Sequence, residues 1–167
     1  MRRHIRPFTA RHEPRGTFIS HVKSGSGAMV GMALVGGLST LTGLPLLIAP
    51  LGATAVLLFG QPASPLAQPM NIFGGYLVAA FVGAGAMALF PASWLAAALA
   101  VGIAIALMLM LRVTHPPAGA LPLVAMASPF QGPNLFVVVL IGCISLISLA
   151  LLHHWLPPRK QYPVRID

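Results

Sequence analysis

Two side chains that could interact with a charged solute lie three positions apart in an otherwise apolar part of the chain. Arg112 is the only charged residue between Lys23 and Arg159, and His115 follows it closely. An arginine at the end of an apolar segment usually extends to the lipid headgroups, but it could also attract anions to a pore mouth. His115 could cap the next helix, contact or gate a solute, or relay a proton, because imidazole titrates near neutral pH.

Acidic residues are confined to the two ends of the chain, where Glu13 and Asp167 are the only carboxylates. Cation transporters and cation pores commonly use intramembrane Asp or Glu, so the chain predicts selectivity for an anion or a neutral polar solute. His115 has no carboxylate partner, and the sequence contains no Ser/His/acid set and no phosphate-binding loop. Cys143 is the single cysteine and is expected to be a small packing residue. We therefore expect neither an enzyme nor a bound cofactor or metal ion.

Two proline-interrupted segments, 46–60 and 116–127, are apolar but too short for ordinary membrane spans. Each is expected to form a half-helix, because Pro50 and Pro117 suit the first turn of a helix. The N-terminus of a helix carries unpaired N–H groups and a partial positive charge, which favour an anion or a carbonyl oxygen. We expect both N-termini to converge on the solute site, with glycines allowing close approach to the backbone. The candidate site residues are Pro50, Gly52, Ala53, Thr54, Arg112, Thr114, His115, Pro116, Pro117 and Gly119.

The composition of the chain indicates a membrane protein. Of its 167 residues 57% are hydrophobic and 7% are charged, whereas about 25% are charged in a typical soluble domain. Four apolar stretches, at 24–44, 71–90, 93–111 and 134–155, are long enough to cross a bilayer as helices. We predict an all-α integral membrane protein with four transmembrane helices and two half-helices. Tyr76, Trp94, Trp155, His153 and His154 are expected at the membrane interfaces. Small residues four positions apart predict close helix packing at Gly27 and Gly31, at Gly75, Ala79 and Gly83, and at Ala96, Ala100 and Ala104.

The sequence indicates two copies of one arrangement, in which a half-helix lies between two spans. Pro50, Gly52, Ala53 and Pro62 match Pro117, Gly119, Ala120 and Pro129 at one constant offset, which predicts repeats at about 24–90 and 92–156. If the short segments re-enter on one side, the repeats are parallel; if they cross, the protein has six spans as two inverted repeats of three. Basic segments at 1–23 and 157–167 flank this 24–156 domain and are interpreted as cytoplasmic anchors rather than as a nucleic-acid-binding surface.

Two motifs resemble those of the HPP family of integral membrane proteins. The His-Pro-Pro motif stands at 115–117 within THPPAGALP, and PLGATAVLLFGQPASPLAQPMN at 50–71 is similar to the second family pattern. The resemblance covers about residues 24–155. It implies four transmembrane helices and a transport function, and family members in chloroplasts and cyanobacteria are associated with nitrite transport.

Together these features predict a channel or transporter for a small inorganic anion, with nitrite as the leading candidate. The alternatives are a channel for a small neutral polar solute and a non-transporting membrane scaffold or subunit. A chain of this size is small for a pore, so a homo-oligomer is expected. We place the protein in the bilayer of a bacterial inner membrane, with both termini cytoplasmic.

Overall fold

The computed structural model describes residues 9–11, 15–127 and 134–165, and this part of the chain contains helices and no strand. The predicted all-α fold class is therefore confirmed. Glu13, Asp167, Pro129 and residues 1–8 and 12–14 of the basic N-terminal segment lie outside the described residues. The helices are α2 (Phe18–Thr42), α3 (Ala49–Ala55) continued by the π-helical turn η1 (Val56–Gly60), the 3-10 turn η2 (Pro65–Ala67), α4 (Pro69–Leu89), α5 (Trp94–Met110), the 3-10 turn η3 (Pro116–Ala120) leading into α6 (Leu121–Ala127), and α7 (Asn134–Trp155).

Helices form at all four positions where spans were predicted. Three of them, α2, α4 and α7, are long and apolar enough to cross a membrane, whereas α5 is shorter with 17 residues, about 25 Å. The first helix begins at Phe18, earlier than predicted, because the Thr17 side chain caps it by accepting a hydrogen bond from the Ser20 N–H. Lys23 therefore lies inside α2 and not in a segment that precedes it.

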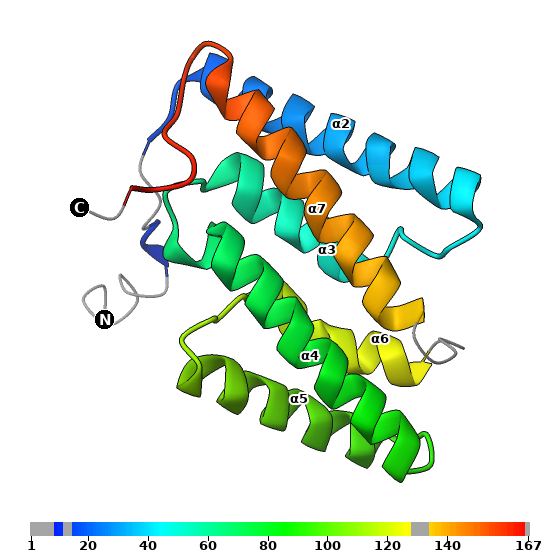
Figure 1. Cartoon of the computed structure of the whole chain (residues 1–167). Coiled ribbons are helices and arrows are strands. Elements are labelled where there is room, and N and C mark those ends of the chain that lie inside the picture. Colours follow the sequence, from blue (N-terminus) through cyan, green and yellow to red (C-terminus); the bar gives the residue numbers. More distant parts are fainter. Residues whose placement is uncertain (1–8, 12–14, 128–133, 166–167) are drawn as a thin grey trace.

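Both short segments are helical, as predicted, and each has proline in its first turn. Figure 1 shows that segment 49–60 starts at the end of the bundle where α2 finishes and leads toward the end where α4 begins. In the same way, segment 116–127 leads from the end of α5 toward the start of α7 (Figure 1). Neither segment turns back, so their directions favour the inverted arrangement of two three-helix repeats over re-entry. The start of α2 and the end of α7 lie at the same end of the bundle (Figure 1).

The two halves of the chain pack against each other in an equivalent way. The first helix of each half contacts the last helix of the other, since α2 packs on α7 and α5 packs on α4. The two last helices, α4 and α7, also contact each other. Close packing through small residues is confirmed, because the predicted positions are all buried: Gly27, Gly31, Gly75, Ala79, Gly83, Ala96, Ala100 and Ala104.

Large apolar side chains cover the outside of the bundle. Phe81, Leu109 and Leu152 are each at least 60% exposed, and they come from three different helices. An exterior with this many exposed apolar side chains is suited to lipid rather than to water. Trp94 and Trp155 lie exposed at helix ends, where interfacial aromatic residues were predicted.

Candidate functional site

His115 is completely buried and joins three separate parts of the chain. Its Nδ1 atom lies 2.8 Å from the carbonyl oxygen of Leu66, in the turn η2. Because a carbonyl oxygen only accepts, Nδ1 carries a proton and donates it. Its Nε2 atom lies 2.8 Å from the Thr54 Oγ1 atom in α3. The histidine therefore connects the beginning of the second half-helix with the first half-helix.

Tyr76 completes this cluster from α4. Its hydroxyl oxygen lies 2.9 Å from Thr54 Oγ1, and its ring centroid lies 5.4 Å from that of His115. Thr54 and Tyr76 are both fully buried. Thr54 Oγ1 also lies 3.1 Å from the carbonyl oxygen of Pro50, one turn earlier in α3. We call Thr54, Tyr76 and His115 the junction cluster.

The local backbone holds His115 in place from both sides. Upstream, the turn that follows α5 places Arg112 in the left-handed region at φ 58°, and the Val113 N–H donates to the Met108 carbonyl. Downstream, the proline at 116 keeps His115 extended at φ −134° and ψ 100°. In between, the Asn71 side-chain amide donates to the Thr114 carbonyl at 3.0 Å. The chain therefore has little freedom around the imidazole.

Gly75 allows α4 to lie directly against this loop. A Cβ atom at Gly75 would come within 2.7 Å of the His115 Cβ atom and 3.0 Å of the Val113 carbonyl oxygen. Neither neighbour is the end of a flexible side chain. Glycine at position 75 is thus a packing requirement of the junction cluster.

The structure brings only part of the predicted site together. Thr54 and His115 are in direct contact, and the buried prolines Pro50 and Pro117 begin the two segments. Gly119 is buried, whereas Gly52 and Thr114 are partly buried. Ala53, Arg112 and Pro116 are exposed. Thr54, near the end of α3, contacts His115 at the start of the second segment, and the exposed residues lie outside that contact. That the two helix N-termini converge on a solute stays a prediction.

Two residues that were expected at the membrane interfaces are buried within the bundle. Tyr76 was expected at an interface but lies fully buried in α4, because its hydroxyl finds a partner in Thr54. His154 was also expected at an interface but is 2% exposed, and its Nε2 lies 2.7 Å from the Leu58 carbonyl oxygen. That carbonyl lies near the end of η1, where the helix itself offers no partner.

The C-terminal segment after α7 folds back over the turn that supplies Leu66. The Tyr162 hydroxyl donates to the Ala67 carbonyl at 3.1 Å, and the Val164 N–H donates to the Gln68 Oε1 atom at 2.9 Å. Burial raises the pKa of Tyr162 above the value of an exposed tyrosine. At the same end of the bundle, Lys23 donates to the carbonyl oxygen of Pro158 at 2.7 Å.

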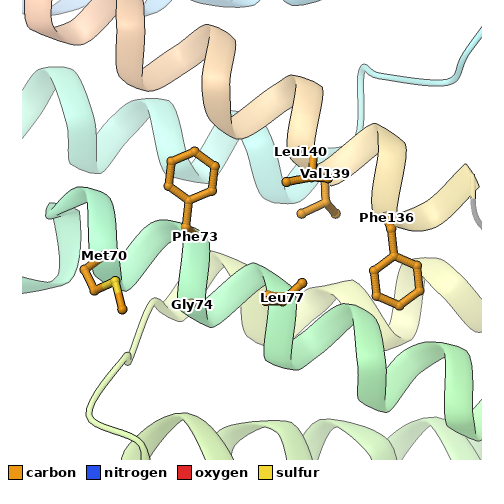
Figure 2. A pocket seen from close by; sticks show the side chains of 7 residues that line it. All are labelled: Met70, Phe73, Gly74, Leu77, Phe136, Val139 and Leu140. Atoms are coloured by element: carbon orange, nitrogen blue, oxygen red, sulfur yellow. The ribbon is translucent and has the colours of Figure 1, made fainter.

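A separate groove of about 180 Å³ lies between α4 and α7. Figure 2 shows that only apolar side chains face it from the two helices, so it offers an ion no polar partner. Among the described residues, no three His, Cys, Asp or Glu side chains come together to share a metal ion. The residues that line the groove are Met70, Phe73, Gly74, Leu77, Phe136, Val139 and Leu140.

Comparison with known proteins identifies the family. The transmembrane region that defines the HPP family matches residues 13–163, which include both half-helices and the junction cluster. The chain belongs to the HPP family. The resemblance carried by the two sequence motifs is thereby confirmed.

Two transmembrane proteins of Dictyostelium discoideum are similar to this HPP protein. One is 36% identical over 126 residues, which cover 71% of this chain and 40% of the relative. The other is 34% identical over 129 residues, which cover 72% of this chain and 45% of the relative. The HPP protein therefore spans less than half of the length of these curated relatives. No solved structure matches the chain.

Proposed function

We propose that this HPP-family membrane protein transports a small inorganic anion, with nitrite as the leading candidate. We name nitrite because other members of the family are associated with nitrite transport. The proposal includes a bacterial inner membrane, with both chain ends on the cytoplasmic side, and it includes neither enzymatic activity nor a cofactor. A homo-oligomer is also part of the proposal.

The observation that carries this proposal is the junction cluster itself. Thr54 and His115 meet at the contact of two interrupted helices and bury their polar atoms completely. Interrupted helices at membrane depth are tolerated where protein or a cavity covers their backbone, and in transporters they commonly form the solute site. A polar cluster at this contact is what a transport site requires.

The charge of the surrounding residues supports an anion rather than a cation. From residue 24 to residue 158 the sequence contains no carboxylate, so no fixed negative charge attracts a cation to the junction cluster. The three side chains instead carry O–H and N–H groups, the kind of donor from which anions accept, although in this conformation they pair with one another and with backbone carbonyls. A small neutral polar solute is the second candidate, because the same groups are uncharged when His115 is neutral.

Burial of the cluster supports a gated path rather than an open pore. Thr54, Tyr76 and His115 each have no exposed surface, so a solute reaches them only after helices move. We therefore favour a carrier or a gated channel. Gly52 and Gly119 follow closely after the starts of the two segments. A Cβ atom added at Gly52 would have no neighbour within 4 Å, and one added at Gly119 would meet only Ile105, at 3.8 Å.

Anion flux into proteoliposomes tests the proposal. The purified protein is reconstituted, and the initial uptake of nitrite, nitrate, formate and chloride is compared with uptake into empty vesicles. We expect saturable uptake of nitrite that is lost in His115→Ala and reduced in Gly119→Leu, which fills the space beside the second half-helix. Gly119→Ala is the matched control, because its methyl group meets Ile105 at an ordinary contact distance.

The other candidate functions predict different results in the same vesicles. Uptake of urea or glycerol without anion uptake would assign the protein to neutral solutes. Wild-type protein that moves none of the anions and no neutral solute would support the scaffold alternative. In either case the anion proposal is rejected.

A further inference from the structure

The junction cluster contains more acceptor positions than protons. Thr54 has one hydroxyl proton, yet its Oγ1 atom lies within hydrogen-bond distance of the Pro50 carbonyl, the Tyr76 hydroxyl and His115 Nε2. The other side of the imidazole is fixed, because Nδ1–H donates to the Leu66 carbonyl. The direction of the Thr54 hydrogen bond therefore depends on whether Nε2 carries a proton.

Both protonation states of His115 are satisfied without any movement of heavy atoms. In the neutral state the Thr54 hydroxyl donates to Nε2 and accepts from the Tyr76 hydroxyl. When a proton binds to Nε2, the Nε2–H donates to Thr54 Oγ1, and the Thr54 hydroxyl turns to donate to the Pro50 carbonyl. Only the hydroxyl proton of Thr54 changes its partner. The geometry suits a histidine that gains and loses a proton.

Among the residues that the structure describes, no carboxylate balances the charge of the protonated state. The residues that surround the imidazole are Thr54 from α3, Tyr76 and Gly75 from α4, and the Leu66 carbonyl from η2. On the side of α5, Met108 lies beside Gly75 and Thr114.

The titratable groups beside the ring, a tyrosine and a cysteine, ordinarily carry no charge at physiological pH, and the charge that precedes His115 in the sequence has the same sign as an imidazolium. Tyr76 faces the ring, and Cys143 on α7 lies near Tyr76. Arg112 is exposed, three positions before the histidine. A buried imidazolium without a counter-ion is costly, so it forms readily only when an anion lies beside it.

We infer that the protein moves one proton together with each monovalent anion, and that this proton is carried on His115 Nε2. This inference rests on the proposed anion transport. The anion and the proton enter from the same side, each making the binding of the other favourable. After the protein opens to the other side, both leave, Nε2 is neutral again, and the Thr54 hydroxyl turns back from the Pro50 carbonyl. One negative and one positive charge cross together, so the net transport is electroneutral.

The test measures proton movement and voltage dependence in the same proteoliposomes. Nitrate is used beside nitrite, because nitric acid is fully ionised and does not carry protons through lipid. A trapped pH-sensitive dye reports internal pH, and potassium gradients with valinomycin set the membrane potential. We expect internal acidification of one proton for each nitrate or nitrite taken up above the empty-vesicle rate. The initial uptake rate should be the same at zero and at inside-negative potential.

Two pairs of variants locate the proton. His115→Asn keeps a donor toward the Leu66 carbonyl but cannot gain a proton. It should therefore abolish the acidification and lower the initial uptake rate at least tenfold. Thr54→Ser keeps the hydroxyl and should retain proton coupling, whereas the similarly shaped Thr54→Val should lose it. Monodisperse elution and an unchanged circular dichroism spectrum establish that each variant is folded. A Thr54→Val variant that is folded and still fully coupled would contradict the assignment to this cluster.

The outcomes separate this inference from the proposed function. Anion uptake that is driven by an inside-positive potential and brings in no proton would overturn proton coupling and leave anion transport intact. Absence of uptake of any anion would reject the transport proposal. Proton coupling that persists in full in His115→Asn would assign the proton to another group.

Discussion

Gly75→Ala is the most informative substitution outside the junction cluster, because it adds one methyl group where the structure leaves no space. The new Cβ atom would lie 2.7 Å from the His115 Cβ atom and 3.0 Å from the Val113 carbonyl oxygen. Both neighbours belong to the constrained loop before η3, so α4 and this loop must move apart by several tenths of an ångström.

The cost follows from packing and from the hydrogen bonds that the shift disturbs. Overpacking of this kind destabilises a protein by about 1–3 kcal/mol. The 2.8 Å hydrogen bond between Thr54 and His115 is the first to lengthen, and its loss would add about 1 kcal/mol. We therefore expect a destabilisation of about 2–4 kcal/mol and a fall in anion uptake of at least tenfold.

Gly85→Ala is the matched control on the same helix. A Cβ atom at Gly85 has no neighbour within 4 Å, so this variant should keep wild-type stability and uptake. Unfolding free energies in mixed micelles and initial uptake rates are measured for both variants. If Gly75→Ala matched Gly85→Ala in both measurements, the close fit of α4 against His115 would not be a requirement of the fold or of transport.

Three further predictions concern Tyr76, His154 and the partly buried Tyr162. Tyr76→Phe removes the hydroxyl that contacts Thr54 and should lower the unfolding free energy in micelles by about 1 kcal/mol. An unchanged unfolding free energy would argue against this hydrogen bond. His154→Leu leaves the Leu58 carbonyl without its donor and should cost about 1–3 kcal/mol in the same measurement, and wild-type stability would show that water replaces the imidazole. Because burial raises the pKa of Tyr162, the docked C-terminal segment should be stable below about pH 10, the pKa of an exposed tyrosine, and should detach as pH rises above it. Limited proteolysis after brief exposure to each pH follows that detachment, and a Tyr162→Phe variant should lack the pH dependence.

Much of the fold could be predicted because apolar runs and prolines have direct physical consequences. The runs that form α4, α5 and α7 are bounded by proline or by polar residues, which fixed their positions closely. The start of α2 was missed because the cap at Thr17 lies within a basic segment that otherwise looked like a cytoplasmic anchor. The direction of the short segments could not be predicted, since both schemes place the chain ends on the same side.

The candidate site was only partly visible in the sequence. Thr54 and His115 were selected because each lies at a proline-containing helix start, and the structure brings them into contact. Tyr76 was missed because a tyrosine within an apolar run resembles any interfacial aromatic, and its partner lies on another helix. The Leu66 carbonyl has no signature in a sequence, because a backbone group is available at every position.

A transport site at the junction cluster is tested most directly by the initial rate of nitrite uptake into proteoliposomes that contain wild-type protein, His115→Asn or Gly85→Ala. We expect uptake well above empty vesicles for wild type and Gly85→Ala, and a rate at least tenfold lower for His115→Asn. Equal rates for His115→Asn and wild type, or a wild-type rate no greater than that of empty vesicles, would contradict a transport site at the junction of the two half-helices.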